Sequence, residues 1–360
     1  MSRLYGCEKL IVGRGATGVC AVLEANKDRL GAGANIVVPA NADYSLVYPI
    51  VLNGFVPVFT DVDAATGNVV YEDVVKAVEQ NNAVAVIVPH MYGNPVSDII
   101  SIGDYCNAKG IMLIEDCSLA AGAYTADGAV CFRCGSIGDY AVYSTGASKT
   151  VDVGCGGFVI QNTQNFADLS EVSAIYETYC DKSVDAKDTE KFFLDLYEMI
   201  REAKPNDLSK TIWESFCADN AKVMRDFFAY KDESCEEPVE KALKDIDDMI
   251  AQRREKAQLY TDYLKKCEKI EIYSFEEGSV PWMFCFKVNK RQKGELFDYL
   301  KNNNVLVKNC YPAVISLFGN DPAVYKGALE MEQEMICIPL MVENDEIIRV
   351  CWLINNFFDD

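Results

Sequence analysis

The chain has few of the features that would place it at a membrane, on nucleic acid or around a structural metal. Its 360 residues include one histidine and three tryptophans, and no apolar run approaches the length of about 18 residues needed for a membrane span. Lysine and arginine number 34 against 55 aspartates and glutamates, which gives a formal net charge of −21. This balance disfavours nucleic acid and anionic membrane surfaces as partners, because both are bound mainly through Lys and Arg. A small phosphorylated ligand remains compatible with it, since a helix N-terminus can bind one phosphate.

Cysteine is abundant, but its distribution does not suggest a disulfide framework. The 15 cysteines are odd in number and scattered along the chain, which indicates free thiols in a reducing cytoplasm. Cys131 and Cys134 form a lone C-x-x-C motif, and a zinc site needs about four ligands, so we expect no metal. A redox role for this pair is the remaining alternative. The segment Met1–Cys7 lacks the apolar core of a signal peptide, and we expect none.

The hydrophobic pattern predicts an α/β fold. Short apolar runs alternate with amphipathic stretches from residue 8 to about 165, which is typical of a mostly parallel sheet covered by helices on both faces. Residues 165–235 are acidic and helical in pattern, and Pro238 opens a long amphipathic helix. We therefore expect a large domain over residues 1–238 and a smaller domain over residues 239–360. Strands are expected at Leu10–Val12, Ile36–Val38, Val56–Phe59, Ala83–Val88, Ile111–Ile114, Tyr140–Tyr143, Ile270–Tyr273, Met283–Val288 and Met335–Pro339, and helices at Val19–Leu30, Tyr71–Gln80, Ile99–Ala108 and Glu295–Leu300.

A glycine-rich turn follows the first expected strand. The segment Gly13–Gly18 reads G-x-G-x-x-G and precedes a helical pattern, which favours binding of a phosphate at the helix N-terminus. The same pattern occurs in nicotinamide dinucleotide sites. Asp43 matches the acidic residue of such sites only poorly. A glycine turn without any ligand is the third interpretation.

Two further segments carry chemically useful side chains. Asp116 ends a buried strand, where ligands of open α/β sheets bind; it could hold a metal, a ribose or a protonated ring nitrogen, or cap a helix. Lys149 follows a strand and a run of small hydroxyl residues, and a glycine cluster comes after it. A desolvated lysine has a lowered pKa and attacks carbonyl groups. A solvated surface lysine is the alternative.

Taken together, the motifs resemble a known family. In chain order they are Gly13–Thr17, Val37–Ala40 with Gly54–Asp63, His90–Pro95 (H-x-Y-G-x-P), Ile114–Asp116 (I-E-D), Gly135–Gly157 (G-S-I-G-D to G-C-G-G) and Arg253–Glu255 (R-R-E). This series resembles the DegT-like sugar aminotransferases, which are pyridoxal-phosphate (PLP) enzymes of the aspartate-aminotransferase fold. The resemblance covers most of residues 8–165 and returns at 239–360. It implies a three-layer large domain with a mostly parallel central sheet and a smaller α+β C-terminal domain.

The resemblance also implies roles for individual residues. Lys149 would hold PLP as a Schiff base and then shuttle protons, and Asp116 would pair with the pyridinium nitrogen. The expected contacts to the cofactor come from Gly15, Ala16, Thr17, Asp116, Ser118, Ser144 and Lys149, with Ser144 and the backbone of Ala16 and Thr17 at the phosphate. Candidates for contacting the substrate are Tyr44, His90 and Tyr311; we favour a structural role for His90.

The function implied is transfer of an amino group, with glutamate as the expected donor, to a keto group of a nucleotide-linked deoxy sugar. Such a reaction serves the synthesis of surface polysaccharides or natural products. The family's active sites lie at a dimer interface, so the resemblance implies a homodimer with shared sites. The cysteine distribution predicts a cytoplasmic location. Partners would be a nucleotide sugar or another small keto substrate and an amino-acid donor, without nucleic acid or membrane.

Several positions depart from the family pattern. Leu119 stands where the family has glutamine, Asp43 where a ring-stacking aromatic is usual, and Cys310 and Ser316 where histidines occur. The family's N-x-R segment is not recognisable in residues 200–235. These departures keep open a PLP enzyme that acts on a non-sugar ketone such as a cyclitol, as an aminotransferase or a lyase. A nicotinamide-dependent oxidoreductase and a non-catalytic relative are the further alternatives.

Overall fold

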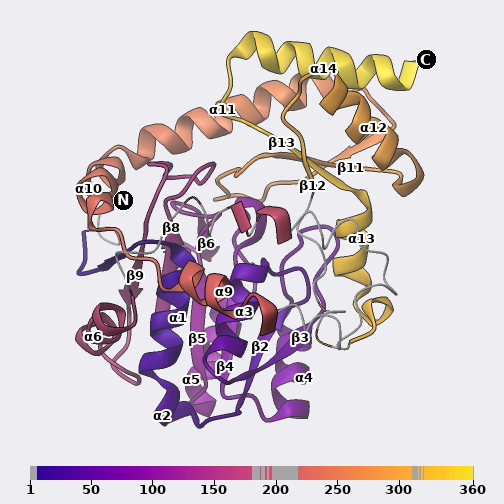
Figure 1. Cartoon of the computed structure of the whole chain (residues 1–360). Coiled ribbons are helices and arrows are strands. Elements are labelled where there is room, and N and C mark those ends of the chain that lie inside the picture. Colours follow the sequence, from indigo (N-terminus) through magenta and orange to yellow (C-terminus); the bar gives the residue numbers. More distant parts are fainter. Residues whose placement is uncertain are drawn as a thin grey trace.

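The computed structural model describes residues 6–180, 187, 191, 192, 194–196, 218–309, 315, 318 and 320–359. Within these residues the chain forms a large lower lobe and a smaller upper lobe (Figure 1). The upper lobe contains the C-terminal helix, and the N-terminal end of the described chain lies beside the lower lobe.

The lower lobe is built on a seven-stranded sheet with the strand order β1-β9-β8-β5-β4-β2-β3. Neighbouring strands from β8 to β3 are parallel, and only β9 runs against both of its neighbours. This confirms the predicted mostly parallel sheet. The strands are β1 (Leu10–Val12), β2 (Asn35–Pro39), β3 (Val56–Thr60), β4 (Ala85–Pro89), β5 (Met112–Asp116), β8 (Tyr140–Ser144) and β9 (Gly157–Gln161).

Helices cover both faces of this sheet. Helix α1 (Gly15–Ala25) contacts α3 (Tyr44–Leu52), α6 (Leu169–Tyr179) and α9 (Ala221–Phe228) on one face. Helices α4 (Tyr71–Asn81) and α5 (Ile99–Lys109) cover the other face. The strand order explains this division: the β2-to-β3 and β3-to-β4 connections run in opposite directions along the sheet, and right-handed crossovers then place their helices on opposite faces.

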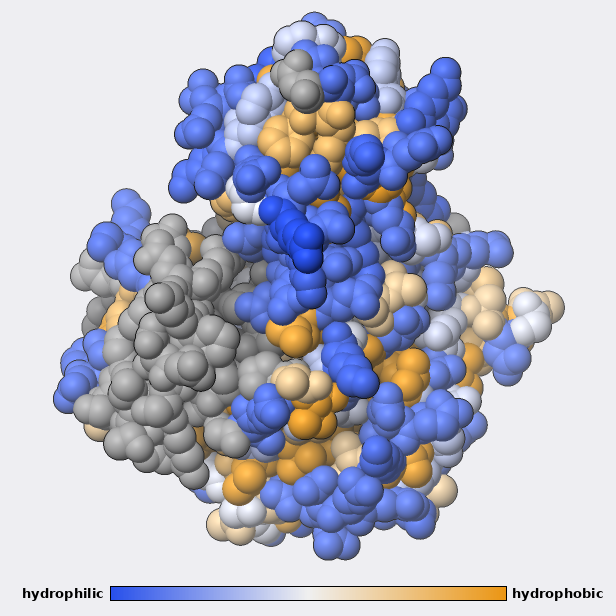
Figure 2. All heavy atoms as spheres, turned by 90° about the vertical axis from the view of Figure 1, so that its right-hand side faces the viewer, coloured by the Kyte–Doolittle hydropathy of each residue, from blue (hydrophilic) through white to orange (hydrophobic). Residues whose placement is uncertain are grey.

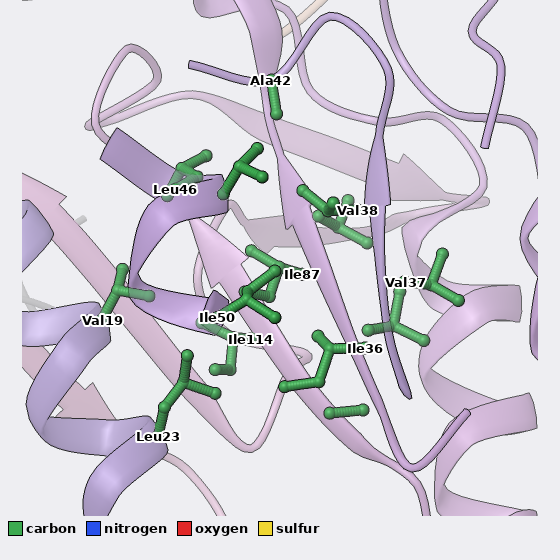
Figure 3. Close-up of a cluster of buried hydrophobic side chains, with 14 of the residues drawn as sticks. Val19, Leu23, Ile36, Val37, Val38, Ala42, Leu46, Ile50, Ile87 and Ile114 are labelled. Atoms are coloured by element: carbon green, nitrogen blue, oxygen red, sulfur yellow. The ribbon is translucent and has the colours of Figure 1, made fainter. Parts of the chain in front are cut away.

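The core of the lower lobe forms between these layers. Val19 and Leu23 of α1, and Leu46 and Ile50 of α3, gather around Ile114 of β5 (Figure 3). Both helical pairs are four residues apart, so each helix presents one apolar face to the sheet. The central strands are buried on both faces, which explains their nearly continuous apolar sequences.

Two predicted helices are each interrupted in the structure. Helix α1 ends at Ala25, and a short helix α2 (Lys27–Leu30) follows. The break is at Asn26, whose side-chain amide donates to the Val22 carbonyl and the Tyr140 hydroxyl, while its oxygen accepts from the Ala167 N–H. These side-chain bonds add to those of the Asn26 backbone, whose N–H donates to the Val22 and Leu23 carbonyls at 3.3 Å.

The long helix expected after Pro238 is also two helices, α10 (Glu236–Lys244) and α11 (Ile246–Leu264). They meet at Asp245, whose backbone leaves the helical region at φ −99° and ψ 11°. The bend lets Leu243 of α10 and Ile246 of α11 pack into one cluster with residues of β8 and β9. The domain boundary near Pro238 stays a prediction.

The upper lobe contains a four-stranded antiparallel sheet with the order β10-β11-β13-β12. Helix α11 runs from the lower lobe into the upper one and packs beside the C-terminal helix α14 (Figure 1). The elements are β10 (Ile270–Ile272), β11 (Phe284–Val288), α12 (Lys290–Asn302), β12 (Lys308–Asn309), α13 (Lys326–Glu334), β13 (Met335–Ile338) and α14 (Asn344–Asp359). A separate hairpin, β6 (Tyr124–Asp127) and β7 (Val130–Arg133), lies outside both sheets.

Within the described part of the chain, no helix combines the length and the apolar character needed to span a membrane. One face of the molecule is mostly hydrophilic, with its apolar side chains in separate patches (Figure 2).

The two lobes are joined by backbone hydrogen bonds at the H-x-Y-G motif. The N–H groups of Val280 and Trp282 donate to the carbonyls of Gly93 and Tyr92 at 2.9 and 3.0 Å. Tyr92 and Gly93 both have positive φ, at 58° and 93°. A Cβ on residue 93 would lie 1.9 Å from the Val280 carbonyl oxygen, so glycine is the residue that allows this approach.

We predict that Gly93→Ala destabilises the protein by roughly 3 kcal/mol, because it adds a backbone collision to the strain of positive φ. Gly110→Ala is the matched control: Gly110 also has positive φ, at 67°, but a Cβ added there would meet nothing within 4 Å. It should cost roughly 1 kcal/mol. Urea unfolding measures both, and equal losses would contradict the proposed role of the junction.

Candidate functional site

A cavity of about 340 Å³ opens at the C-terminal edge of the large sheet. Its wall includes Asp43 beyond β2, His90 beyond β4, Asp116 at the end of β5 and Ser144 at the end of β8. These four strands are consecutive in the sheet. Residues that are far apart in sequence therefore meet at one edge, because parallel strands end on the same side.

Lys149 lies on the loop that connects β8 to β9 and lines this cavity. Burial lowers the pKa of its amine, and the charges of Asp43 and Asp116 partly oppose that shift. Within the described residues, no hydrogen bond or ion pair to its Nζ is found. Ser148, directly before it, has a φ of 68°, and its N–H donates to an Asp152 carboxylate oxygen at 2.7 Å. This strained backbone is held in place by the loop itself.

Asp116 faces the same cavity from the end of β5. Its carboxylate is 7% exposed and accepts the Ser118 N–H at 3.0 Å. Burial raises the pKa of this carboxyl group, while the bonds from Ser118 and the charge of Lys149 oppose the shift. A buried carboxylate in a cavity that also holds an amine is suited to pair with a cationic ring nitrogen.

The other end of the cavity is formed by the N-terminus of α1. Gly15, Ala16, Ser118 and Ser144 line it. The helix has no side-chain cap and no acidic residue in its first turn, so its leading N–H groups are available to an anion. A Cβ at Gly15 would stand 3.1 Å from the Ser144 Cβ and fill this space. Thr17, also expected here, is fully buried and does not line the cavity; its Oγ1 has no hydrogen-bond partner.

The glycine turn does not belong to a dinucleotide-binding fold. It follows β1, which lies at the edge of the large sheet and pairs antiparallel with β9. In a nicotinamide-binding fold the corresponding strand lies inside a parallel sheet. The structure therefore does not support the oxidoreductase alternative.

Arg14 adds a cation to the cavity that the sequence analysis did not single out. Its guanidinium lies 4.4 Å from the ring centres of both Phe227 and Tyr230, and its Nη1 donates to the Phe227 carbonyl at 3.0 Å. Both aromatic residues also line the cavity. Cation–π contacts of this kind fix the orientation of a guanidinium. The position of Arg14 inside the glycine turn could have suggested from sequence that it lies near a ligand. Its aromatic partners could not be foreseen, because they lie more than 200 residues away in the chain.

His90 and Glu115 form a buried structural pair. The His90 Nε2 lies 2.9 Å from a Glu115 carboxylate oxygen, and its Nδ1 accepts the Val96 N–H. Nδ1 therefore carries a lone pair, and the Nε2–H donates to the carboxylate. Although the ring borders the cavity, these two bonds use both of its nitrogens; a structural role for His90 stays a prediction.

Glu115 also binds the backbone of the G-S-I-G-D segment. Its oxygens accept the N–H groups of Gly135, Ile137 and Gly138 at 2.6–2.8 Å. Burial by itself raises the pKa of Glu115, but the bonds from His90 and from this backbone outweigh it and hold the pKa below its ordinary value of 4.5. The carboxylate is thus charged, buried and fully paired.

Tyr44, which the sequence predicts at the substrate, does not line the cavity. Tyr44 is fully buried and stacks on Tyr48, with ring centres 5.3 Å apart. Its neighbours Asp43 and Ser45 line the cavity instead, because the first turn of α3 directs Tyr44 into the core. Tyr311 lies outside the described residues, and so do Cys310 and Ser316.

The comparison with protein families agrees with this geometry. The model of the DegT/DnrJ/EryC1/StrS aminotransferase family matches residues 8–193 and 239–354. The chain belongs to this family.

The individual relatives share limited sequence identity with this chain or match only part of it. A dTDP-4-dehydro-2,3,6-trideoxy-D-glucose 4-aminotransferase from Saccharopolyspora spinosa is 38% identical over 36% of this chain, which spans about a third (32%) of that protein. GDP-perosamine synthase from Escherichia coli O157:H7 is 21% identical, with 92% of this chain and 81% of that protein covered. DesV of S. venezuelae, solved in complex with a ketimine intermediate, is similar in fold, with a TM-score of 0.72, 17% identity and coverage of 97% and 84%.

The structure shows what the first arginine of the family's R-R-E motif contacts. Arg253 of α11 is 4% exposed, and its guanidinium donates to the carbonyls of Trp282 at 2.8 Å and of Lys149. Burial lowers its pKa to about 10, partly opposed by Asp152, so it stays charged at neutral pH. Arg253 thus ties the Lys149 loop to the segment that enters the small sheet. The motif was recognised from sequence, but this role was not.

Two departures from the family pattern lie in the cavity wall. Leu119 is 5% exposed and lines the cavity where glutamine is usual. Asp43 caps α3 by accepting the Ser45 N–H at 2.7 Å, and it also lines the cavity. An apolar and an acidic side chain thus replace an amide and an aromatic ring, which alters what the cavity can bind.

We predict that Glu115→Gln destabilises the protein by about 3 kcal/mol at pH 7, because an amide cannot accept all of these bonds. Since the folded pKa is lowered, the carboxylate stabilises the protein above its ordinary pKa of 4.5, and this contribution is lost as pH falls through the folded value. The difference in melting temperature between wild type and variant should therefore shrink in acid. Glu72→Gln, at an exposed position in α4, is the control. A gap that stayed constant with pH would contradict the assignment.

Proposed function

We propose that the protein is a PLP-dependent aminotransferase that acts on a keto group of a nucleotide-linked deoxy sugar. The observation that supports this most directly is that Lys149, Asp116 and the α1 N-terminus meet in one cavity. The sugar-converting relatives named above supply the class of substrate. As in the family, glutamate is the proposed amino donor.

The cavity fits PLP at three places. The α1 N-terminus with Ser144 and Ser118 offers N–H and hydroxyl donors to a phosphate, in a space that a Cβ at Gly15 would fill. Asp116 offers a buried carboxylate to the ring nitrogen. Lys149 offers an amine whose pKa is lowered by burial. When bound, PLP supplies an electron sink for the carbon that loses or gains a proton.

The protein's own groups then orient the reactants and move protons. Asp116 would hold the ring nitrogen of bound PLP in its protonated form, because a buried carboxylate favours a partner cation. Lys149, whose amine has a pKa lowered by burial, would hold the cofactor aldehyde and, as a neutral amine, would accept and return protons at its Nζ. Ser144 and the helix N-terminus would hold the phosphate and so orient the cofactor in the cavity that Lys149 also lines.

Arg14 is suited to recognise a second anionic group. It lines the cavity at the α1 end, and Phe227 and Tyr230 hold its guanidinium in place. The α-carboxylate of an amino donor needs such a partner, since Asp43 and Asp116 make the remainder of the wall acidic. We propose that Arg14 binds the donor carboxylate or adds to the phosphate site.

We also propose a cytoplasmic homodimer with shared active sites, as the family resemblance implies. The cysteines of the described residues are free thiols, which is in keeping with a reducing compartment.

The function is tested with purified protein, PLP, glutamate and a nucleotide-linked 4-keto-6-deoxy sugar. We expect equal amounts of 2-oxoglutarate and amino sugar, measured by mass spectrometry. Lys149→Ala should abolish turnover and the absorbance band of PLP bound to lysine, whereas Lys109→Ala, at an exposed position on α5, should change neither. Amination of a cyclitol ketone but not of the sugar would overturn the proposed substrate. Full turnover by Lys149→Ala would overturn the mechanism.

The lowered pKa of Lys149 gives a separate prediction for cofactor capture. Only the neutral amine reacts with the PLP aldehyde, so the capture rate should rise with pH and level off below pH 10.5, the ordinary lysine value. Asp43→Asn removes a charge that raises this pKa, so its midpoint should lie at still lower pH. Stopped-flow absorbance measures both profiles. A midpoint at or above 10.5 in the wild type would contradict a desolvated amine.

A further inference from the structure

A pair of cysteines joins two segments of the cavity wall that are far apart in sequence. Cys155 lies in the glycine cluster after Lys149, lines the cavity and is partly exposed. Cys235 ends the short helix η2 (Glu233–Cys235) and is fully buried. Their Sγ atoms lie 2.6 Å apart across a separation of 80 residues. The two thiols are thus in contact without any movement of the backbone.

The backbone on both sides of this contact is held in place. A Cβ on Gly156, which has a φ of 80°, would lie 2.9 Å from the Cys235 Cβ, so the two chain segments touch at this point. The Thr145 hydroxyl donates to the Cys155 carbonyl at 2.6 Å. On the other side, the Asp232 carboxylate accepts the Ser234 N–H at 2.9 Å and fixes the turn that carries Cys235.

Asp232 lies close enough to the two sulfurs to raise the question of a metal site. Two thiolates on one tetrahedral zinc, at a Zn–S distance of about 2.3 Å, stand roughly 3.8 Å apart. The observed separation is much shorter. The Asp232 oxygens also accept bonds from the Tyr230 hydroxyl and from the backbone and hydroxyl of Ser234. The geometry therefore favours a bond between the sulfurs over a shared metal.

We propose that Cys155 and Cys235 are a redox modification site, at which a low-molecular-weight disulfide converts the two thiols into a reversible disulfide bond. The bond would link the Lys149 loop to the segment that carries Phe227 and Tyr230. Because these two rings hold Arg14, the oxidised protein has a covalently fixed cavity wall. This inference does not rest on the proposed function.

The chemistry balances as thiol–disulfide exchange. The Cys155 thiolate attacks one sulfur of the small disulfide, forms a mixed disulfide and releases one thiol. The Cys235 sulfur then attacks the Cys155 sulfur and releases the second thiol, so the protein is oxidised by two electrons and the small disulfide is reduced by two. The protons of both cysteines end on the two released thiols. Asp232, which has a carboxylate oxygen within 4.8 Å of both sulfurs, is placed to accept the proton of the Cys235 thiol on its way out.

The order of the two attacks follows from the surroundings of each sulfur. Burial raises the pKa of Cys235, and its contacts with Cys155 and Asp232 raise it further. Cys155 is the residue that reaches the cavity and can meet a small molecule. The first attack therefore belongs to Cys155, and Cys235 resolves the mixed disulfide.

The full chain provides its own control pair. Cys285 and Cys337 are opposite one another on β11 and β13, with sulfurs 3.4 Å apart, but both are fully buried. We titrate the protein with glutathione disulfide, alkylate the remaining thiols and map the peptides by mass spectrometry. The expected result is a disulfide link between Cys155 and Cys235 that dithiothreitol reverses. Cys285 and Cys337 should stay reduced and should therefore be found alkylated.

Thermal unfolding supplies a second readout. Oxidation should raise the melting temperature of the wild type by ~5 °C or more, because the bond closes a long loop in the unfolded chain. Cys155→Ser and Cys235→Ser should lose both the link and this rise, whereas Cys337→Ser should keep both. Circular dichroism checks that the variants fold.

Two results would overturn the proposal. One is a stable glutathione adduct on Cys155 that never transfers to Cys235. The other is stoichiometric zinc in the purified protein that protects both cysteines from alkylation until a chelator removes it. The Cys155–Cys235 disulfide can be measured even if the aminotransferase assay fails, so the two proposals can be refuted independently.

Discussion

The site depends on two neighbouring carboxylates at the end of β5, one of which holds the surrounding chain in place while the other faces the cavity. Successive side chains of a strand point to opposite faces, so Glu115 enters the protein interior while Asp116 faces the cavity. Glu115 accepts bonds from His90 and from three backbone N–H groups of residues 135–138. It thereby fixes the segments on either side of the strand. Among the described residues, the Asp116 carboxylate accepts a hydrogen bond from Ser118, and it faces the cavity where a ligand could bind.

The electrostatics of the cavity follow from its two ends. At one end, an uncapped helix N-terminus and Arg14 favour anions. At the other, Asp116 and Asp43 face an amine whose own charge is disfavoured by burial. A phosphorylated molecule with a cationic ring and an aldehyde matches both ends: its phosphate suits the helix N-terminus, and its ring and aldehyde suit the carboxylates and the amine. The overall charge of −21 has little bearing on this, because such a ligand responds to the few groups that touch it.

The cavity is also a junction between distant segments. Arg253 binds the Lys149 carbonyl to the segment leading into β11, and the H-x-Y-G loop bonds to residues 280 and 282. Cys155 and Cys235 add a third link, from the Lys149 loop to the aromatic pair around Arg14. The Arg253 bonds and the cysteine contact tie the Lys149 loop to two other parts of the chain, so the position of the Lys149 amine depends on packing in both lobes.

The sequence by itself determined the α/β class, most strands of the large sheet and the residues from β8 to Lys149, because hydrophobic periodicity and short motifs depend on neighbours along the chain. It did not predict β9 or the hairpin of β6 and β7, which depend on pairing between strands. It also did not predict the helix breaks at Asn26 and Asp245, where side chains contact distant parts of the chain. Tertiary structure alone decided that Thr17 and Tyr44 are buried away from the cavity, and that Arg14, Arg253 and Cys155 acquire their partners. Those partners come from residues 80 to more than 200 positions away, and no local pattern encodes contacts formed only when strands and lobes assemble.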